Sequence, residues 1–204
     1  AQSESYLGHP WCPHWCHVAH LNTDHGKMSK SKGEFLTVSL LEEKGYDPLA
    51  YRFFCLQSHY RKSLVFTWEN LDNATVAYNK LLTRIAALKD EGEVEQAAFD
   101  EYKARFTAAM DNDLNTSMAV TVLYDVLKAK VSDETKRALI GQFDTVLGLG
   151  LMDAAEKIFR GTIDFVRGSA DSVGAETEQV LLLGDDVVNK TIPVILCAEE
   201  NVQG

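Results

Sequence analysis

Cysteine is scarce in this chain, and long apolar runs are absent. The 204 residues contain four cysteines, Cys12, Cys16, Cys55 and Cys197, and their uneven spread argues against the disulfide framework of a small secreted protein. No run of about 18 apolar residues could form a transmembrane helix. No basic segment followed by an apolar one, as in a signal peptide, stands at the start. We therefore expect a cytoplasmic protein with no membrane partner.

Basic residues are outnumbered, with 20 Lys and Arg against 30 Asp and Glu and a formal net charge of −10. This balance argues against a protein that coats nucleic acid without specificity. A local basic cluster on an acidic body can still contact phosphates, and Lys27, Lys30 and Lys32 form one candidate, with Arg61 and Lys62 as a second. The apolar fraction of 46% and the length allow one ordinary domain or two small ones. Because the first residue is not methionine, we expect a processed, cropped or partial chain.

The most informative stretch is the polar segment Lys27-Met28-Ser29-Lys30-Ser31-Lys32-Gly33. A phosphoryl transition state gathers negative charge on its oxygens, and positioned ammonium groups stabilise that charge. The serines offer local hydrogen bonds, and Gly33 allows a sharp turn. A solvated lysine-rich turn is the alternative for an arbitrary segment of this composition.

The ordered string resembles the KMSKS signature of class I aminoacyl-tRNA synthetases, and the flanking strings resemble the cysteinyl-tRNA synthetase family. This resemblance runs from residue 1 to about residue 157. The strings that carry it are Ala1–Glu4, Trp15–Leu21, Tyr46–Phe53, Ser58–Arg61, Trp68–Leu71 and Ala109–Thr116.

The resemblance implies ATP-dependent activation of cysteine, with Mg²⁺ accompanying ATP, and transfer of cysteine to tRNA(Cys). Lys27 and Lys30 would be catalytic, and the ATP-binding residues would be Lys27, Met28, Ser29, Lys30 and Ser31. The family's HIGH motif and its Zn²⁺ ligands would lie upstream of Ala1, so no metal ligand is assigned here. The chain resembles a C-terminal half without a complete active site, monomeric unless paired with a separate N-terminal half. Glu34 departs from the asparagine usual in the family, and its carboxylate would partly oppose the lysines.

The hydrophobic pattern predicts a mainly α chain. We expect a strand over residues 15–21, a short helix over 35–43, a helix that starts at Asp47-Pro48, and four amphipathic helices that form an antiparallel bundle. With the resemblance, this gives the end of a Rossmann-like catalytic domain with the KMSKS loop (1–45), stem-contact helices (46–90), a helical tRNA-facing domain (91–157) and an unassigned tail (158–204). For the tail, a divergent extension, a foreign fusion and a sequence error all stay open.

Two groups of polar residues have competing interpretations. The six residues His9, Cys12, His14, Cys16, His17 and His20 invite a zinc hypothesis, but no Cys-x-x-Cys pair is present, and we favour a structural role. The acidic spacing of Asp111, Asp113 and Asn115 opens like an EF-hand but lacks its glycine and final glutamate, so we favour a capped helix junction.

His59 has no identifiable carboxylate partner nearby in the sequence, which favours a structural or tRNA-backbone role for His59-Tyr60-Arg61. We expect Trp15 and Trp68 to be core anchors and Cys55 to be a small buried hydrophobe.

Two further functions stay open beside cysteine–tRNA ligation. A ligase that joins cysteine to an amino-sugar in thiol biosynthesis would share the catalytic half and the segment of residues 27–33, which we call the lysine loop. A non-catalytic helical module that binds tRNA or a partner would fit the missing upstream half and the unassigned tail.

Overall fold

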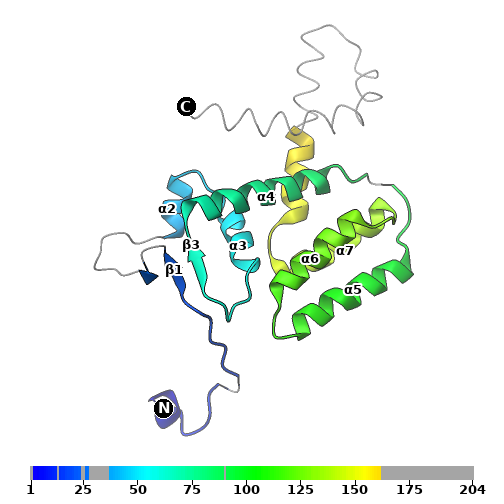
Figure 1. The fold of residues 1–204 in the computed structure, drawn as a ribbon. Helices are drawn as coiled ribbons and strands as arrows, with labels where there is room; N and C mark the ends of the chain where they lie inside the picture. The colour runs from blue at the N-terminus through cyan, green and yellow to red at the C-terminus, as the bar shows by residue number, and fades with distance from the viewer. Residues whose placement is uncertain (1, 13, 24–25, 28–36, 90, 162–204) are drawn as a thin grey trace.

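A computed structural model describes residues 2–12, 14–23, 26–27, 37–89 and 91–161. Figure 1 shows a mainly helical chain in which a small sheet with α2–α4 lies beside α5, α6 and α7. The elements are α1 (Gln2–Leu7), β1 (Leu21–Thr23), β2 (Gly26–Lys27), α2 (Val38–Glu43), α3 (Pro48–Leu56), β3 (Leu64–Phe66), α4 (Trp68–Ala86), α5 (Gln96–Asp111), α6 (Thr116–Lys128) and α7 (Asp133–Leu147), with further helix over 151–161. No described helix is long and apolar enough to cross a membrane.

The N-terminal segment projects away from the rest of the chain (Figure 1). α1 buries no residue. Trp15 is 65% exposed, so the prediction that Trp15 is a core anchor is wrong. The strand predicted over residues 15–21 is also wrong apart from its last residue, because β1 begins at Leu21. A strand needs a hydrogen-bonded neighbour, and β3 reaches only Leu21–Thr23.

The three short strands form one sheet in the order β2-β1-β3. β1 pairs antiparallel with β2, where Asn22 lies opposite Lys27, and parallel with β3, where Leu21 lies opposite Leu64. Parallel neighbours need a long crossover, which here contains α2 and α3. This arrangement is typical of the α/β class of catalytic domains.

Local capping signals set most helix ends. The Asp47 carboxylate accepts from the Leu49 backbone N–H at 2.7 Å, and Pro48 is the first helical residue, as predicted. Ser132 caps α7 through its hydroxyl, and Gly148 ends that helix with φ +62°. The predicted helix over 35–43 is shorter in the structure, since α2 begins after the Thr37 N-cap, and residues 35–36 lie outside the described part.

The amphipathic pattern correctly predicted the buried face of α4. Leu71, Ala74, Tyr78, Leu81 and Ile85 are all buried. α4 packs mainly on α3, whereas α5, α6 and α7 pack on one another. An antiparallel four-helix bundle that includes α4 therefore stays a prediction.

One hydrophobic core joins α3 and α4 to the later helices. At its centre the rings of Phe106 in α5 and Phe143 in α7 stack with centroids 4.1 Å apart. A second, smaller cluster, which includes Leu41, Phe54 and Phe66, lies between α2, α3, β3 and α4. The sheet and the helices thus share α3 and α4 as their common support.

The turn between α7 and the helical stretch 151–161 is tied down by hydrogen bonds from three elements. The Asp144 carboxylate accepts from the backbone N–H groups of Leu149 at 2.7 Å and Leu151 at 2.8 Å. Tyr78 of α4 donates its hydroxyl to the Leu149 carbonyl at 2.7 Å, and Arg52 of α3 donates Nε to the Leu147 carbonyl at 2.7 Å. The start of the last described helix is thereby fixed to α3 and α4.

We expect Asp144→Ala to lower the free energy of unfolding by about 2 to 6 kcal/mol. It leaves two partly buried amides without their acceptor, and each such loss costs roughly 1 to 3 kcal/mol. Asp144→Asn keeps one carbonyl oxygen and should lose about half as much. Urea denaturation of the three proteins measures this difference, and equal stability of all three would contradict it.

Several tyrosines should titrate late. The hydrogen bond to Asp72 raises the pKa of Tyr46 to about 12, and burial raises the pKa of Tyr51 to about 12 and that of Tyr78 further. These groups ionise at about pH 10 when the chain is unfolded. Their contribution to stability is therefore complete below pH 10 and is lost as the pH rises through 12.

We expect alkaline unfolding in which late tyrosinate absorbance and loss of helical circular dichroism occur together above pH 10. Titration of every tyrosine near pH 10 with the helices intact would contradict this expectation.

Candidate functional site

The lysine loop starts at the edge of the sheet. Lys27 is the last residue of β2, and its backbone lies opposite Asn22 of β1. The remaining predicted ATP-binding residues, Met28, Ser29, Lys30 and Ser31, lie outside the described residues. The described chain resumes at Thr37, whose hydroxyl accepts from the Leu40 N–H at 3.2 Å and caps α2. The structure therefore defines the two ends of the loop segment.

The helix that follows the loop is held against the start of α4. The Tyr46 hydroxyl donates to the Asp72 carboxylate at 2.5 Å, and the Tyr46 and Trp68 rings stack with centroids 5.7 Å apart. The Lys44 ammonium lies 4.9 Å from the centroid of the Trp68 ring. Trp68 is thus partly buried in the second cluster, as expected of a packing residue, and it supports the end of α2.

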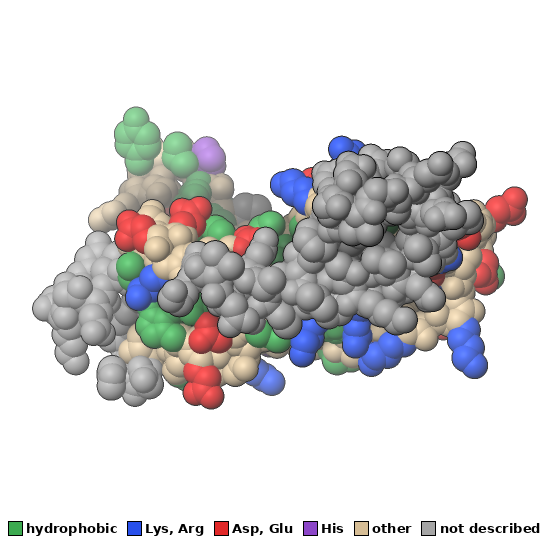
Figure 2. Space-filling model, turned by 90° about the horizontal axis from the view of Figure 1, so that it is seen from above, with side chains coloured by type: hydrophobic (Ala, Val, Ile, Leu, Met, Phe, Trp, Pro, Cys, Tyr) green, Lys and Arg blue, Asp and Glu red, His purple; other side chains and the backbone are tan. Residues whose placement is uncertain are grey.

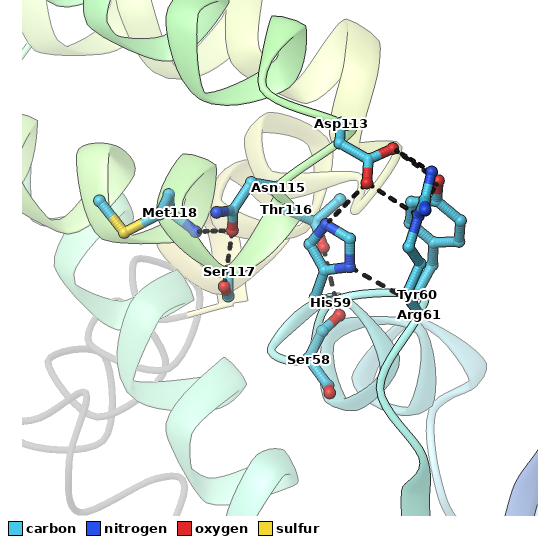
Figure 3. A network of polar contacts seen from close by, with 9 residues as sticks. All are labelled: Ser58, His59, Tyr60, Arg61, Asp113, Asn115, Thr116, Ser117 and Met118. Carbon is cyan, nitrogen blue, oxygen red and sulfur yellow. Dashed lines mark hydrogen bonds and ion pairs between the residues drawn. The ribbon is translucent and has the colours of Figure 1, made fainter. Parts of the chain in front are cut away.

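A network of polar contacts joins the segment after α3 to the turn between α5 and α6, and we call it the Asp113 junction (Figure 3). The Tyr60 hydroxyl donates to Asp113 Oδ1 at 2.6 Å, and Arg61 Nε lies 2.8 Å from Asp113 Oδ2. His59 Nε2 lies 3.8 Å from the same oxygen. The junction consists of His59, Tyr60, Arg61 and Asp113.

The electrostatics of the junction favour an ionised Asp113. The Tyr60 hydroxyl, ahead of the Arg61 guanidinium, lowers the pKa of the Asp113 carboxyl. In turn the hydrogen bond to Asp113 raises the pKa of Tyr60. Because these side chains lie at the surface, their ion pair contributes little to the free energy of unfolding. Its effect is to orient the turn between α5 and α6 relative to residues 59–61.

The backbone of this turn is unusual. Asp113 and Leu114 have φ of +56° and +52°, in the left-handed region that non-glycine residues rarely adopt. Asn115 then caps α6, its side-chain oxygen accepting from the Met118 N–H at 3.2 Å. Asp113 and Asn115 are therefore used as junction and cap, which confirms the favoured account of this acidic spacing.

His59 has no carboxylate partner near it in the sequence, but the fold brings Asp113, 54 residues further along the chain, to 3.8 Å from His59 Nε2. The pairing also changes the view of Arg61 as a tRNA contact. Its guanidinium is already paired with Asp113, although it is 66% exposed. Lys62, the other predicted tRNA-binding residue, lies exposed beside it.

The histidines and cysteines near the N-terminus do not gather. No three His, Cys, Asp or Glu side chains among the described residues are grouped so that they could hold a metal ion. Cys16 and His20 are exposed, and Cys12 donates its thiol to the His14 carbonyl at 2.8 Å. Cys55 is partly buried in the second cluster, and burial raises the pKa of its thiol, in agreement with the predicted packing role.

Three family models match parts of the chain. The model for the class I (C) tRNA synthetase catalytic domain matches residues 1–76, and the model for the DALR domain matches residues 105–152. A third model, for the SufBD core domain of the SUF system of FeS cluster assembly, matches residues 148–204. The tail thus resembles a different family from the rest of the chain.

Curated relatives cover the same first part of the chain. Cysteine–tRNA ligase 1 of Burkholderia lata is 41% identical over 154 residues, which are 75% of this chain and 32% of the relative. The cysteine–tRNA ligase of Novosphingobium aromaticivorans is 44% identical over 151 residues, 72% of this chain and 31% of the relative. The cysteine–tRNA ligase of Borrelia turicatae is 34% identical over 174 residues, which are 78% of this chain and 36% of the relative. The chain therefore spans about a third of the length of these relatives.

The matches to the class I (C) tRNA synthetase catalytic domain and to the DALR domain indicate that this part of the chain is similar to class I aminoacyl-tRNA synthetases, and the small sheet with its helical crossover is consistent with such a catalytic domain. Within that class, the relatives to which this part is similar at 41% and 44% identity are cysteine–tRNA ligases.

Proposed function

We propose that this chain carries the C-terminal portion of a cysteine–tRNA ligase of the cytoplasm. The observation that supports this most is the similarity to cysteine–tRNA ligases over about three quarters of the chain. The reaction would be cysteine plus ATP giving cysteinyl-adenylate and pyrophosphate, followed by transfer of cysteine to the end of tRNA(Cys).

Lys27 and Lys30 would stabilise the charge that develops on the α-phosphate and on the departing pyrophosphate. Met28, Ser29 and Ser31 would shape the loop around ATP. The position of Lys27 at the end of β2 supports this role, because a strand end fixes the point from which the loop extends. Mg²⁺ would accompany ATP, and the proposal assigns zinc to no residue of this chain.

The helical part, residues 91–157, would face tRNA, with residues 46–90 contacting its stem. Figure 2 shows Lys and Arg side chains along one edge of the molecule, despite the net charge of −10. Such an edge can contact phosphates on an otherwise acidic protein. Lys62 is the candidate contact beside the Asp113 junction, and Arg61 would contribute less because Asp113 already pairs with it.

The test is cysteine-dependent ATP–pyrophosphate exchange by the full chain, alone and mixed with the N-terminal remainder of the Novosphingobium relative. We expect no exchange by the chain alone, exchange by the mixture, and cysteine transfer to tRNA. Exchange by the chain alone would show that the pockets assigned upstream lie within this chain. A mixture that forms a complex without exchange would favour the non-catalytic helical module.

The same mixture separates the two ligase hypotheses. If activated cysteine is transferred to an amino-sugar and not to tRNA(Cys), the chain belongs to thiol biosynthesis. Transfer to tRNA(Cys) alone supports the proposed function.

The proposal is limited to residues 1–157, because the tail resembles a SufBD core domain. We infer that the tail derives from that second family and takes no part in cysteine activation.

A further inference from the structure

We propose that Asp113 is a positioning residue, which fixes the orientation of the helical part of the chain relative to the sheet that contains Lys27. The inference rests on the proposed function for its consequence in catalysis, but its structural part can be tested without any activity. It begins from the contacts on the two sides of residues 58–61.

On one side, this segment is bonded to the N-terminal strand region. The Ala19 backbone N–H donates to the Tyr60 carbonyl at 2.8 Å, two residues before β1 begins. The Asn22 side chain of β1 donates to the Ser63 hydroxyl at 2.6 Å. Tyr60 and Ser63 are therefore hydrogen-bonded to β1 and to the residues just before it.

On the other side, the same segment is bonded to the turn between α5 and α6. Asp113 receives the Tyr60 hydroxyl and the Arg61 guanidinium, and the Thr116 hydroxyl donates to the Ser58 carbonyl at a longer 3.4 Å (Figure 3). Tyr60 is thus fixed through its side chain to the helical part and through its carbonyl to the strand region.

The conformation of Asp113 adds to this picture. Its carboxylate reaches both Tyr60 and Arg61 from a left-handed backbone, and Leu114 beside it adopts the same conformation while half exposed. A left-handed leucine at an exposed turn is energetically costly and persists only where surrounding contacts hold it. The Asp113 contacts and the Asn115 cap hold this turn together with two backbone hydrogen bonds, from the Leu114 N–H to the Met110 carbonyl at 2.9 Å and from the Asn115 N–H to the Ala109 carbonyl at 3.1 Å.

Two substitutions test the junction without disturbing the backbone. Tyr60→Phe removes only the hydroxyl, which donates to Asp113 and accepts from Arg61 Nε at 2.9 Å. Asp113→Asn keeps the size and the tolerance of a left-handed φ while removing the charge paired with Arg61. Asp111→Ala is the matched control, since Asp111 is an exposed carboxylate two residues earlier at the end of α5.

The first experiment is amide hydrogen exchange on the full chain. We expect exchange at Ala19 to accelerate roughly 3- to 10-fold in Tyr60→Phe, the factor that corresponds to one lost hydrogen bond. Asp113→Asn should act in the same direction, while amides of the Phe143 core and the Asp111→Ala control stay unchanged. Unchanged exchange at Ala19 in both junction variants would overturn the proposal, as would equal acceleration throughout the chain.

The second experiment uses the chain mixed with the N-terminal remainder. Because the junction orients the tRNA-facing part relative to the loop, Tyr60→Phe should lower kcat for cysteine transfer to tRNA about 3- to 10-fold and leave pyrophosphate exchange unchanged. A merely structural loss would lower both rates together and would count against positioning. If the wild-type mixture has no activity, the proposed function fails, and hydrogen exchange still decides the role of Asp113.

Discussion

Replacing Lys30 with alanine should lower kcat for cysteine-dependent pyrophosphate exchange by about 100- to 1,000-fold in the chain paired with its N-terminal remainder. Removal of one donor that stabilises developing charge costs about this factor in other enzymes. The KM for ATP should change less than about threefold, because the lysine would interact more strongly with the transition state than with bound ATP.

The control for this substitution is Lys130→Ala, which removes one lysine charge from an exposed position after α6 and so changes the net charge equally. It should leave both kcat and KM unchanged. An equal loss of ATP affinity and rate in Lys30→Ala would mean that the lysine binds the ground state. The same loss in the control would mean that net charge alone is responsible.

The sequence predicted the features that depend on near neighbours. Asp47, Asn115 and Ser132 cap their helices through amides only two or three residues away, so the local order of residues contains the whole interaction. The buried face of α4 was predictable for a similar reason, because its spacing matches the helical period.

Long-range partners could not be predicted in the same way. Nothing in the spacing links Tyr60 to Asp113, or Tyr78 to the carbonyl of Leu149, since each pair is separated by more than 50 residues. The strand predicted over residues 15–21 failed for the same reason. Its composition suits a strand, but the length of β1 depends on where β3 lies.

The candidate site also has a part that the sequence predicts and a part that depends on long-range contacts. The lysine motif was recognisable from its ordered residues, whereas the geometry around it depends on β1, β3 and α4, which meet only in the fold. The motif therefore predicts the chemistry. The fold shows which distant residues, Tyr60 and Asp113 among them, are brought into contact.

Two boundaries are possible between the synthetase-like part and the tail. The match to the SufBD core domain begins at residue 148, and the match to the DALR domain ends at residue 152. The packing indicates a later boundary. Leu149 and Leu151 are fully buried, Ala155 is 3% exposed, and Ile158 is the last described side chain packed against the core.

Truncation distinguishes these boundaries, and its expected effect is the largest. A chain that ends at Leu147 loses two fully buried leucines and the hydrogen bonds of Tyr78 and Asp144 to residues 149–151. Loss of one buried leucine side chain alone costs about 2 to 5 kcal/mol, so the loss of both approaches or exceeds the whole stability of an ordinary domain. We expect this protein to be unfolded, with no cooperative thermal transition.

A chain that ends at Gly161 keeps the complete described core and should unfold cooperatively, at a urea midpoint close to that of the full chain. Leu151→Ala in the full chain should lie between these extremes, about 2 to 5 kcal/mol less stable than wild type. Cooperative folding of the chain that ends at Leu147 would place the boundary before residue 148. It would also mean that the hydrogen bonds of Tyr78 and Asp144 to residues 149–151 do not stabilise the helical part.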